Sequence, residues 1–238
     1  MNGRAKAAIA AGQPILAANP GGVALPTVEA LAACGVDCLF IDCERTAISI
    51  ESVPPLARTA QALGMSAVVR VPTKDAALLT RYLDCKVDGI VLPLVESAAE
   101  AQALVATART ATKGGEAQLL LIAQIESIAG HRNLEDIAQV SGIDVILIGP
   151  NDLSHSMGFL GDTSRPELKA AVDDIIGRLV ALGRPFGLPA TAASAPDLVR
   201  RGATFVYATL EGLLRPGVSD LRRAMGVLPA ATARMRTS

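Results

Sequence analysis

Short apolar segments with the length of β-strands alternate with helix-like segments along the whole chain, and this alternation constrains the fold most strongly. The strand segments are expected at residues 14–19, 38–42, 67–71, 89–95, 119–126, 143–149, 185–188 and 204–210. Helical patterns follow at 27–34, 52–63, 75–85, 98–112, 134–140, 166–182 and 195–201, and a last one ends near residue 225. Eight strand–helix units in 238 residues predict an α/β fold, a closed parallel (β/α)8 barrel of the TIM type.

The main alternative for such a pattern is a doubly wound open sheet. That fold usually needs fewer strands and a glycine-rich nucleotide loop after the first strand, and Pro20-Gly21-Gly22 does not match that loop. A single domain over residues 1–238 is therefore expected, with an N-terminal helix before the first strand. The Ala- and Arg-rich tail from about residue 228 is expected to fray.

Charge and apolar patterning argue against two classes of partner. The 22 basic and 23 acidic residues nearly cancel, and only 3% of the residues are aromatic, so nucleic acid is not an expected partner. The apolar segments have strand length, and neither a membrane span nor a signal peptide is expected. The four cysteines, Cys34, Cys38, Cys43 and Cys85, lack zinc-site spacing and fit reduced, buried thiols of a cytoplasmic protein.

Polar residues follow the predicted strands at the end where each strand stops. In a parallel barrel these ends share one mouth, so we expect the following side chains to lie together: Asp42, Glu44, Arg45, Arg70, Glu96, Gln124, Glu126, Asn151 and Asp152. A surface loop would scatter such residues without regard to the strand ends. Their placement therefore indicates a catalytic or binding site at the mouth.

Glu126 and Asp152 end two neighbouring strand segments and are the best candidates for metal ligands. Neighbouring strands lie roughly 4.8 Å apart, so both carboxylates can reach one ion. Oxygen ligands without thiolate or imidazole favour Mg²⁺ or Mn²⁺, with Co²⁺ as a further candidate. The alternative for either acid alone is that it caps the helix that follows.

Five segments, taken in order, carry a family resemblance. They are residues 42–47 (Asp-Cys-Glu-Arg-Thr-Ala), 68–72 (Val-Val-Arg-Val-Pro), 91–97 (Val-Leu-Pro-Leu-Val-Glu-Ser), 124–126 (Gln-Ile-Glu) and 149–154 (Gly-Pro-Asn-Asp-Leu-Ser). Together they resemble the successive motifs of the HpcH/HpaI aldolase family, the class II metal-dependent pyruvate aldolases typified by 4-hydroxy-2-oxoheptane-1,7-dioate aldolase. The resemblance runs from about Lys6 to Met225.

This resemblance implies an aldolase, a carbon–carbon lyase that cleaves a 4-hydroxy-2-oxo acid to pyruvate and an aldehyde through a pyruvate enolate. It implies that Glu126 and Asp152 hold the divalent metal and that Arg70 faces the keto oxygen. The pyruvate carboxylate would lie against Gln124 and the backbone of Gly149, Pro150 and Asn151. It also implies a homo-oligomer, commonly a hexamer built as a trimer of dimers, in which paired subunits exchange the last helix.

The chemistry of an enolate fits Arg70, because a guanidinium stays charged and can stabilise a developing oxyanion without titrating. An alternative role for Arg70 is a salt bridge to Asp42 or Glu44 at the mouth, and the two roles are compatible.

Arg45 departs from the family's pattern. Typical members carry a histidine there, which pairs with the equivalent of Asp42 and moves the proton of the aldol hydroxyl. Arginine stays protonated and cannot act as a general base. Either Glu44 or a metal-bound hydroxide takes that role, or the reaction differs; His155 is expected to pack at a loop. We expect Arg45 to bind an anionic part of the substrate.

Two alternative functions remain open at this point. One is a carbon–carbon lyase of the citrate-lyase-beta or malyl-CoA-lyase type, although nothing here resembles the extra CoA-binding C-terminal region of those enzymes. The other is a metal- and oxo-acid-binding paralogue without turnover, which the arginine at position 45 favours. A second departure from the family is the tight turn at residues 113–116, which we expect to leave the pocket more open on that side.

Overall fold

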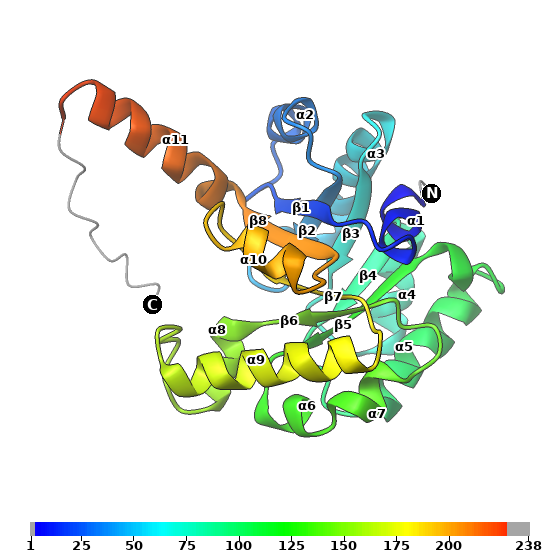
Figure 1. Cartoon of the computed structure of the whole chain (residues 1–238). Helices are drawn as coiled ribbons and strands as arrows, with labels where there is room; N and C mark the ends of the chain where they lie inside the picture. The colour runs from blue at the N-terminus through cyan, green and yellow to red at the C-terminus, as the bar shows by residue number, and fades with distance from the viewer. Residues whose placement is uncertain (1–2, 228–238) are drawn as a thin grey trace.

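The computed structural model describes residues 3–227 and shows a closed barrel of eight parallel strands, so the predicted TIM barrel is confirmed (Figure 1). Each strand pairs with its sequence neighbour, and β1 also pairs with β8 to close the barrel. The strands are β1 (Ile15–Asn19), β2 (Cys38–Asp42), β3 (Ser66–Arg70), β4 (Gly89–Leu92), β5 (Leu120–Ile125), β6 (Val145–Ile148), β7 (Phe186–Pro189) and β8 (Phe205–Thr209).

Helices surround the barrel and follow the predicted order, with two additions. The α-helices are α1 (Arg4–Ala10), α2 (Leu25–Ala33), α3 (Val53–Ala62), α4 (Ala76–Asp84), α5 (Ala98–Ala111), α6 (Ile128–Arg132), α7 (Leu134–Ala138), α8 (Pro150–Ser156), α9 (Pro166–Ala181), α10 (Ala195–Arg200) and α11 (Leu210–Ala224). Short 3₁₀ turns lie at η1 (Ile50–Ser52) and η2 (Glu116–Gln118). The additions are α6 and α8, each of one to two turns.

The α8 helix changes the surroundings of the predicted site. The sequence pattern placed Asn151 and Asp152 just past the end of a strand without predicting a helix there, but Pro150 starts a helix directly after β6. Proline favours the first helical position because its missing N–H has no partner there in any case. Asn151 and Asp152 therefore lie in the first turn of a helix at the mouth.

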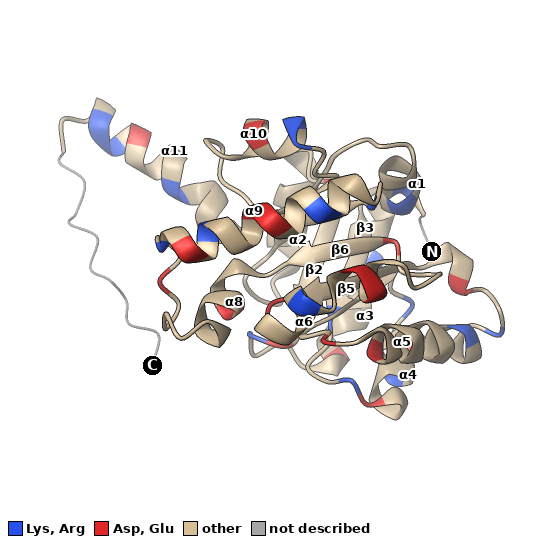
Figure 2. Cartoon of the chain, turned by 60° about the horizontal axis from the view of Figure 1, so that its bottom comes forward, with Lys and Arg blue, Asp and Glu red and all other residues tan. Residues whose placement is uncertain are grey.

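Two apolar layers hold the barrel together. Residues that alternate along the strands fill its interior, among them Cys38, Phe40, Val68, Ile122, Leu147 and Phe205. The other face of each strand packs against the surrounding helices in a larger cluster that includes Leu39, Ile90 and Ile148. Charged residues lie mainly on the outer helices and loops (Figure 2). This two-sided burial is typical of parallel sheets and leaves polar side chains to the strand ends.

The α1 helix covers the end of the barrel at which the strands begin. Its Ala5 and Ile9 belong to the interior cluster, and Lys6 Nζ donates to Leu119 O at 2.7 Å and to Asp144 Oδ2 at 2.9 Å. The turn at residues 113–116 precedes β5 and lies at this same end. The expectation that it opens the pocket was wrong, because the pocket lies at the opposite end.

Residues 3–227 contain no helix long and apolar enough to cross a membrane. All four cysteines are free thiols; Cys38 and Cys43 are buried, but the expected burial was wrong for Cys34, which is exposed, and Cys85 is half-buried. The predicted frayed tail from about residue 228 lies outside the described residues.

Candidate active site

The inward-facing positions of the strands become polar at the mouth. Side chains alternate between the two faces of a strand, so the residue two positions beyond an interior apolar residue also faces inward. Applied to Ala17, Phe40, Val68, Ile122, Leu147 and Phe205, this rule gives Asn19, Asp42, Arg70, Gln124, Gly149 and Tyr207. Six different strands or strand ends thus contribute to one polar layer above the apolar interior.

Arg70 is held between two carboxylates. Its Nε donates to Asp42 Oδ1 at 2.9 Å and its Nη2 to Asp42 Oδ2 at 2.6 Å, and its Nη1 lies 3.1 Å from Glu44 Oε2. Burial alone would lower the pKa of Arg70, but the hydrogen bonds and charges of Asp42 and Glu44 outweigh it and raise the pKa. The salt bridge foreseen for Arg70 is thus present, and the guanidinium is permanently charged.

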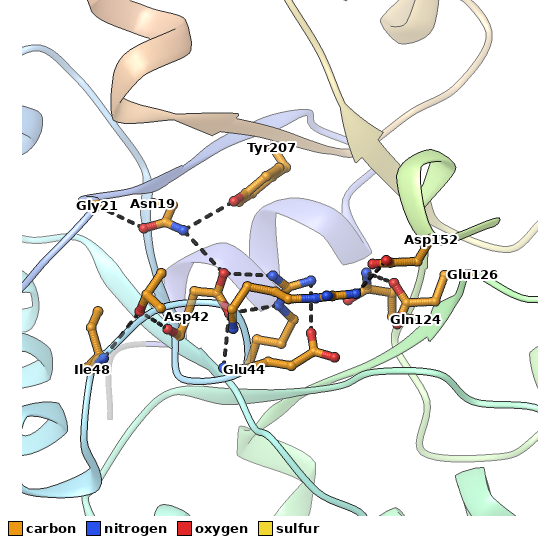
Figure 3. Close-up of polar contacts among 12 residues, drawn as sticks. Asn19, Gly21, Asp42, Glu44, Ile48, Gln124, Glu126, Asp152 and Tyr207 are labelled. Carbon is orange, nitrogen blue, oxygen red and sulfur yellow. Dashed lines mark hydrogen bonds and ion pairs between the residues drawn. The ribbon is translucent and has the colours of Figure 1, made fainter. Parts of the chain in front are cut away.

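Asp42 orients both Arg70 and the loop that follows β2. It is buried, and its Oδ1 also accepts the backbone N–H groups of Glu44 and Arg45, both at 3.2 Å. These bonds fix the loop after β2, so that Glu44 reaches Arg70 and Arg45 reaches Asp152. Figure 3 shows Asp42 and Glu44 on one side of the site and Glu126 and Asp152 on the other.

Two residues that the sequence patterns did not single out complete this network. Asn19 Nδ2 lies 3.3 Å from Tyr207 Oη and 3.5 Å from Asp42 Oδ2. The Tyr207 ring packs on Phe40 with 4.7 Å between centroids. Asn19 ends β1 and Tyr207 lies in the middle of β8. Both are at inward positions, so the two-residue period of the strands would have identified them once a barrel was assumed.

Glu126 and Gln124 form the opposite side of the site. Glu126 is buried, with its Oε1 accepting Leu94 N at 2.8 Å and its Oε2 accepting Gln124 Nε2 at 2.6 Å. Burial raises the pKa of Glu126 to about 7; the Leu94 N–H opposes this rise, and the nearby carboxylates of Glu44 and Asp152 add to it. A cation at this position would relieve the accumulated negative charge.

Gly149 makes the approach of these groups possible. A Cβ atom at this position would lie 2.6 Å from Glu126 Oε2 and 2.9 Å from Gln124 Nε2, closer than van der Waals contact allows. The residue before α8 must therefore be glycine for Glu126 and Gln124 to keep their places.

Helix capping, the alternative role for the two acids, is not what the structure shows for Glu126. The side chain of Ser127, not Glu126, accepts the N–H of Gly130 and caps α6. Asp152 lies in the first turn of α8, one turn inside the cap position. Its carboxylate pairs with Arg45 Nη2 across the mouth.

The donor set at the mouth fits a divalent ion. Each carboxylate oxygen has two lone-pair directions, so the hydrogen bonds to Glu126 leave room for a metal bond. Gln124 Oε1 is buried without a hydrogen-bond partner. Within residues 3–227 no three His, Cys, Asp or Glu side chains are grouped to hold a metal, so Glu126 and Asp152 would need water or substrate oxygens to complete the coordination, as magnesium and manganese sites often do.

A cavity of about 850 Å³ opens at the mouth. Its lining includes the following predicted site residues: Arg45, Arg70, Gln124, Gly149, Pro150, Asn151 and Asp152. Asp42, Glu44 and Glu126 do not line the cavity and contact the lining residues from behind. Glu96 does not join the group, because its Oε1 accepts the hydroxyl of Ser127 at 2.6 Å.

His155 also lines this cavity, which differs from the expected loop packing. It lies in the last turn of α8, three residues after Asp152, and therefore on the same face of the helix. The sequence analysis did not predict α8, and without this helix the place of His155 at the cavity could not be predicted.

Comparison with known families bears on this site directly. Residues 22–212 match the model of the HpcH/HpaI aldolase/citrate lyase family. The chain belongs to this family. The matched segment contains the predicted metal ligands, Arg70 and the whole of the cavity lining, and carbon–carbon lyase is therefore the class of enzyme to which the chain belongs.

Individual HpcH/HpaI relatives are similar over most of their length. A 2-dehydro-3,6-dideoxy-6-sulfogluconate aldolase of Pseudomonas putida is 32% identical over 195 residues, which are 73% of this chain and 75% of the relative. A pyruvate aldolase of Rhizobium etli is 34% identical over 182 residues, 67% of this chain and 72% of the relative.

Solved structures of other proteins share this fold. A family protein from Burkholderia cenocepacia superimposes with a TM-score of 0.84 at 25% identity, covering 94% of this chain and 100% of that chain. A citrate synthase, SbnG, gives a TM-score of 0.83 at 24% identity, covering 93% and 96%, which shows the shared fold.

Proposed function

We propose that this protein is a divalent-metal-dependent aldolase that cleaves a 4-hydroxy-2-oxo acid into pyruvate and an aldehyde. One observation carries the proposal. The buried carboxylate of Glu126, the carboxylate of Asp152 and the charged guanidinium of Arg70 converge at one mouth, where Arg70 and Asp152 line the same cavity. Family relatives named as aldolases support the same class of reaction.

In the proposed cleavage, the hydroxyl on C4 loses its proton, the C3–C4 bond breaks, and its electron pair moves to the C2 oxygen to form the pyruvate enolate. Arg70 stabilises the negative charge on that oxygen, since Asp42 and Glu44 keep its guanidinium in place. A divalent ion at Glu126 and Asp152 would supply Lewis-acid stabilisation of the same oxygen. Mg²⁺ and Mn²⁺ fit the oxygen ligands best, and Co²⁺ is the further candidate.

The pyruvate carboxylate would lie against Gln124 and the start of α8. The N–H groups of Asn151 and Asp152 belong to the first turn of this helix and therefore have no partner within it. Pro150 has no N–H to donate to the carboxylate. Its fixed φ angle starts the helical turn that presents the N–H groups of the next two residues. This arrangement holds the substrate with its C2 oxygen toward Arg70.

Two side chains can accept the proton of the C4 hydroxyl in place of the family's histidine. Burial raises the pKa of Glu44, with Arg70 and Arg45 opposing this rise and Asp42 and Asp152 adding to it, so that its carboxylate is a stronger base than usual. His155 lines the cavity and is exposed at its rim. Cleavage assays of Glu44→Gln and His155→Asn distinguish these two residues, because kcat is expected to fall steeply only when the residue that acts as the base is replaced.

The central experiment measures Mn²⁺ affinity and pyruvate release from 4-hydroxy-2-oxo acids for wild type, Glu126→Gln and Asp152→Asn. Both variants are expected to weaken Mn²⁺ binding and pyruvate release at least tenfold, while the surface variant Asp197→Asn changes neither. Unchanged ion affinity in both site variants, or no pyruvate release by wild type with Mg²⁺ or Mn²⁺, contradicts the proposal.

Arg45 favours a second candidate, a metal- and oxo-acid-binding paralogue without turnover, because arginine cannot take the place of the histidine base. Arg45→His separates the two candidates. Pyruvate release that appears only in this variant supports the binding paralogue, whereas release by wild type supports the aldolase.

We also propose that two subunits pair through α11, and that three pairs form a hexamer. This helix projects away from the barrel (Figure 1) and has no buried residue in the single chain. Its exposed apolar residues include Leu214, Val218 and Leu221, which lie three to four positions apart along one helix, and Leu213 beside Leu214. An apolar stripe of this kind needs a partner, and a second copy of the barrel provides one.

A further inference from the structure

The ion pair between Arg45 and Asp152 places a cation on one of the two proposed metal ligands. Arg45 comes from the loop after β2 and Asp152 from the first turn of α8, so the contact crosses the mouth. Among the described residues, Asp152 is the only side chain that forms a hydrogen bond or ion pair with the Arg45 guanidinium, and the carboxylate of Glu44 also interacts with its charge. The Arg45 side chain remains 56% exposed, against 12% for Arg70.

The two arginines of the site therefore differ in freedom. Arg70 is fixed by Asp42 and Glu44 through three guanidinium nitrogens. The guanidinium of Arg45 is held through one nitrogen by one oxygen, and Arg45 is among the residues that line the cavity. It can change partner without disturbing the network around Asp42.

We propose that Arg45 exchanges between two partners: the Asp152 carboxylate in the metal-free protein, and an anionic group of the substrate once a divalent ion is bound at Asp152. The inference rests on the proposed function. A divalent ion compensates the charge of Asp152 and repels a guanidinium held on the same carboxylate, because like charges a few ångströms apart interact unfavourably. The released guanidinium presents a fork of donors that matches a carboxylate or a sulfonate.

The position of Arg45 indicates which end of the substrate it meets. Arg70 and Gln124 are the more buried of the polar lining residues, and together with Gly149 they are assigned to the pyruvate part. Arg45 is exposed at the rim, on the side where atoms beyond C4 must lie. The preferred substrate is therefore one whose aldehyde part ends in an anionic group.

The first test is the affinity for Mn²⁺ alone, measured by titration calorimetry at low salt for wild type, Arg45→Gln, Arg109→Gln and Asp152→Asn. Arg109 is a matched control, since it also pairs with one carboxylate, Glu116, and its side chain is 67% exposed. We expect Arg45→Gln to bind Mn²⁺ about fivefold more tightly than wild type, and Arg109→Gln to match wild type. Equal or weaker binding by Arg45→Gln overturns the exchange.

The Asp152→Asn arm separates failure of this inference from failure of the proposed function. If Asp152→Asn binds Mn²⁺ as wild type does, the assignment of the metal site is wrong. If it binds weakly while Arg45→Gln is unchanged, only the role of Arg45 is wrong. Thermal unfolding midpoints equal to that of wild type confirm that the variants are folded.

The second test compares addition of pyruvate to succinic semialdehyde, which carries a carboxylate, and to butanal, which is neutral. Wild type is expected to prefer succinic semialdehyde by about tenfold or more in kcat/KM, as for hydrogen bonds to a charged group. Arg45→Gln should lose this preference mainly through KM, and Arg45→Lys should keep part of it. A preference that survives in Arg45→Gln overturns the anion-binding part.

Discussion

Asp42 and Arg70 are direct register partners on β2 and β3, and their side chains meet in a two-bond contact at 2.9 and 2.6 Å. Parallel pairing thus places the acid opposite the arginine whose charge the proposed reaction uses. The Asp42 side chain is 3% exposed and that of Arg70 12%, so neither charge is compensated by water. The pair has to be complete for either residue to stay buried.

Asp42→Ala is expected to lower the free energy of unfolding by about 2 to 4 kcal/mol, because it leaves the Arg70 guanidinium buried with one partner fewer. Urea unfolding followed by circular dichroism measures this loss. Asp197→Ala, which removes a surface pair with Arg200, is expected to cost less than about 1 kcal/mol. Equal losses for the two variants would show that the Asp42 contact contributes no more than a surface pair.

Gly149→Ala is expected to weaken Mn²⁺ binding and pyruvate release at least tenfold, because its Cβ would displace Glu126 and Gln124. Gly177→Ala is the matched control: it lies inside α9, nothing lies within 4 Å of the added Cβ, and alanine favours helix by roughly 0.5 to 1 kcal/mol. Calorimetric titration with Mn²⁺ compares the two. Wild-type affinity in Gly149→Ala would mean that the acids do not need this close approach.

Removal of divalent ions with EDTA is expected to abolish pyruvate release and to leave the barrel folded, since the barrel is held together by its two apolar layers. Activity should return when Mg²⁺ or Mn²⁺ is added and should remain absent when buffer without divalent ions is added. Activity that persists in EDTA at wild-type level would contradict a metal-dependent step.

Leu214→Asp is expected to reduce the mass of the assembly, because Leu214 is 56% exposed on the apolar side of α11. Light scattering after size-exclusion chromatography measures the mass as a multiple of the 24.5 kDa chain. Val180→Asp on α9, where the valine is 53% exposed, serves as the control and should leave the mass unchanged. A wild-type protein that elutes as a monomer contradicts pairing through α11.

Alkylation with iodoacetamide at pH 8 is expected to modify Cys34 first, because its thiol is exposed. Burial raises the pKa of Cys43 to about 11, with a hydrogen bond from Tyr82 opposing the rise. Roughly one Cys43 thiol in a thousand is then ionised at pH 8, and only the thiolate reacts. Peptide mass spectrometry should show Cys43 labelling increase with pH, and all four thiols should react in the denatured protein.

The barrel and the core of the site could be predicted from the sequence because both follow from strand patterns. Apolar runs marked the strands, and the residues at their ends supplied Asp42, Arg70, Gln124 and Glu126, all of which the structure brings to the mouth. Once a closed barrel is assumed, the order of the strands and their inward-facing positions can be assigned from the sequence alone.

The remaining parts of the site depend on contacts that no local pattern encodes. The helix α8 is only 7 residues long, too short for a clear helical period. Its absence from the prediction placed His155 in a loop. Asn19 and Tyr207 come from β1 and β8, which meet only where the barrel closes, and the pairing of Arg45 with Asp152 spans 107 positions of the chain.

The α1 helix closes the barrel at the end opposite the mouth, and its Ala5 and Ile9 pack against the apolar interior. Substrate and both products must then share a single entrance. In the proposed reaction, the aldehyde formed at the rim blocks the way out for the pyruvate beneath it, and product release is therefore sequential. The aldehyde departs first and pyruvate last, so pyruvate alone should compete with the intact substrate for the free enzyme.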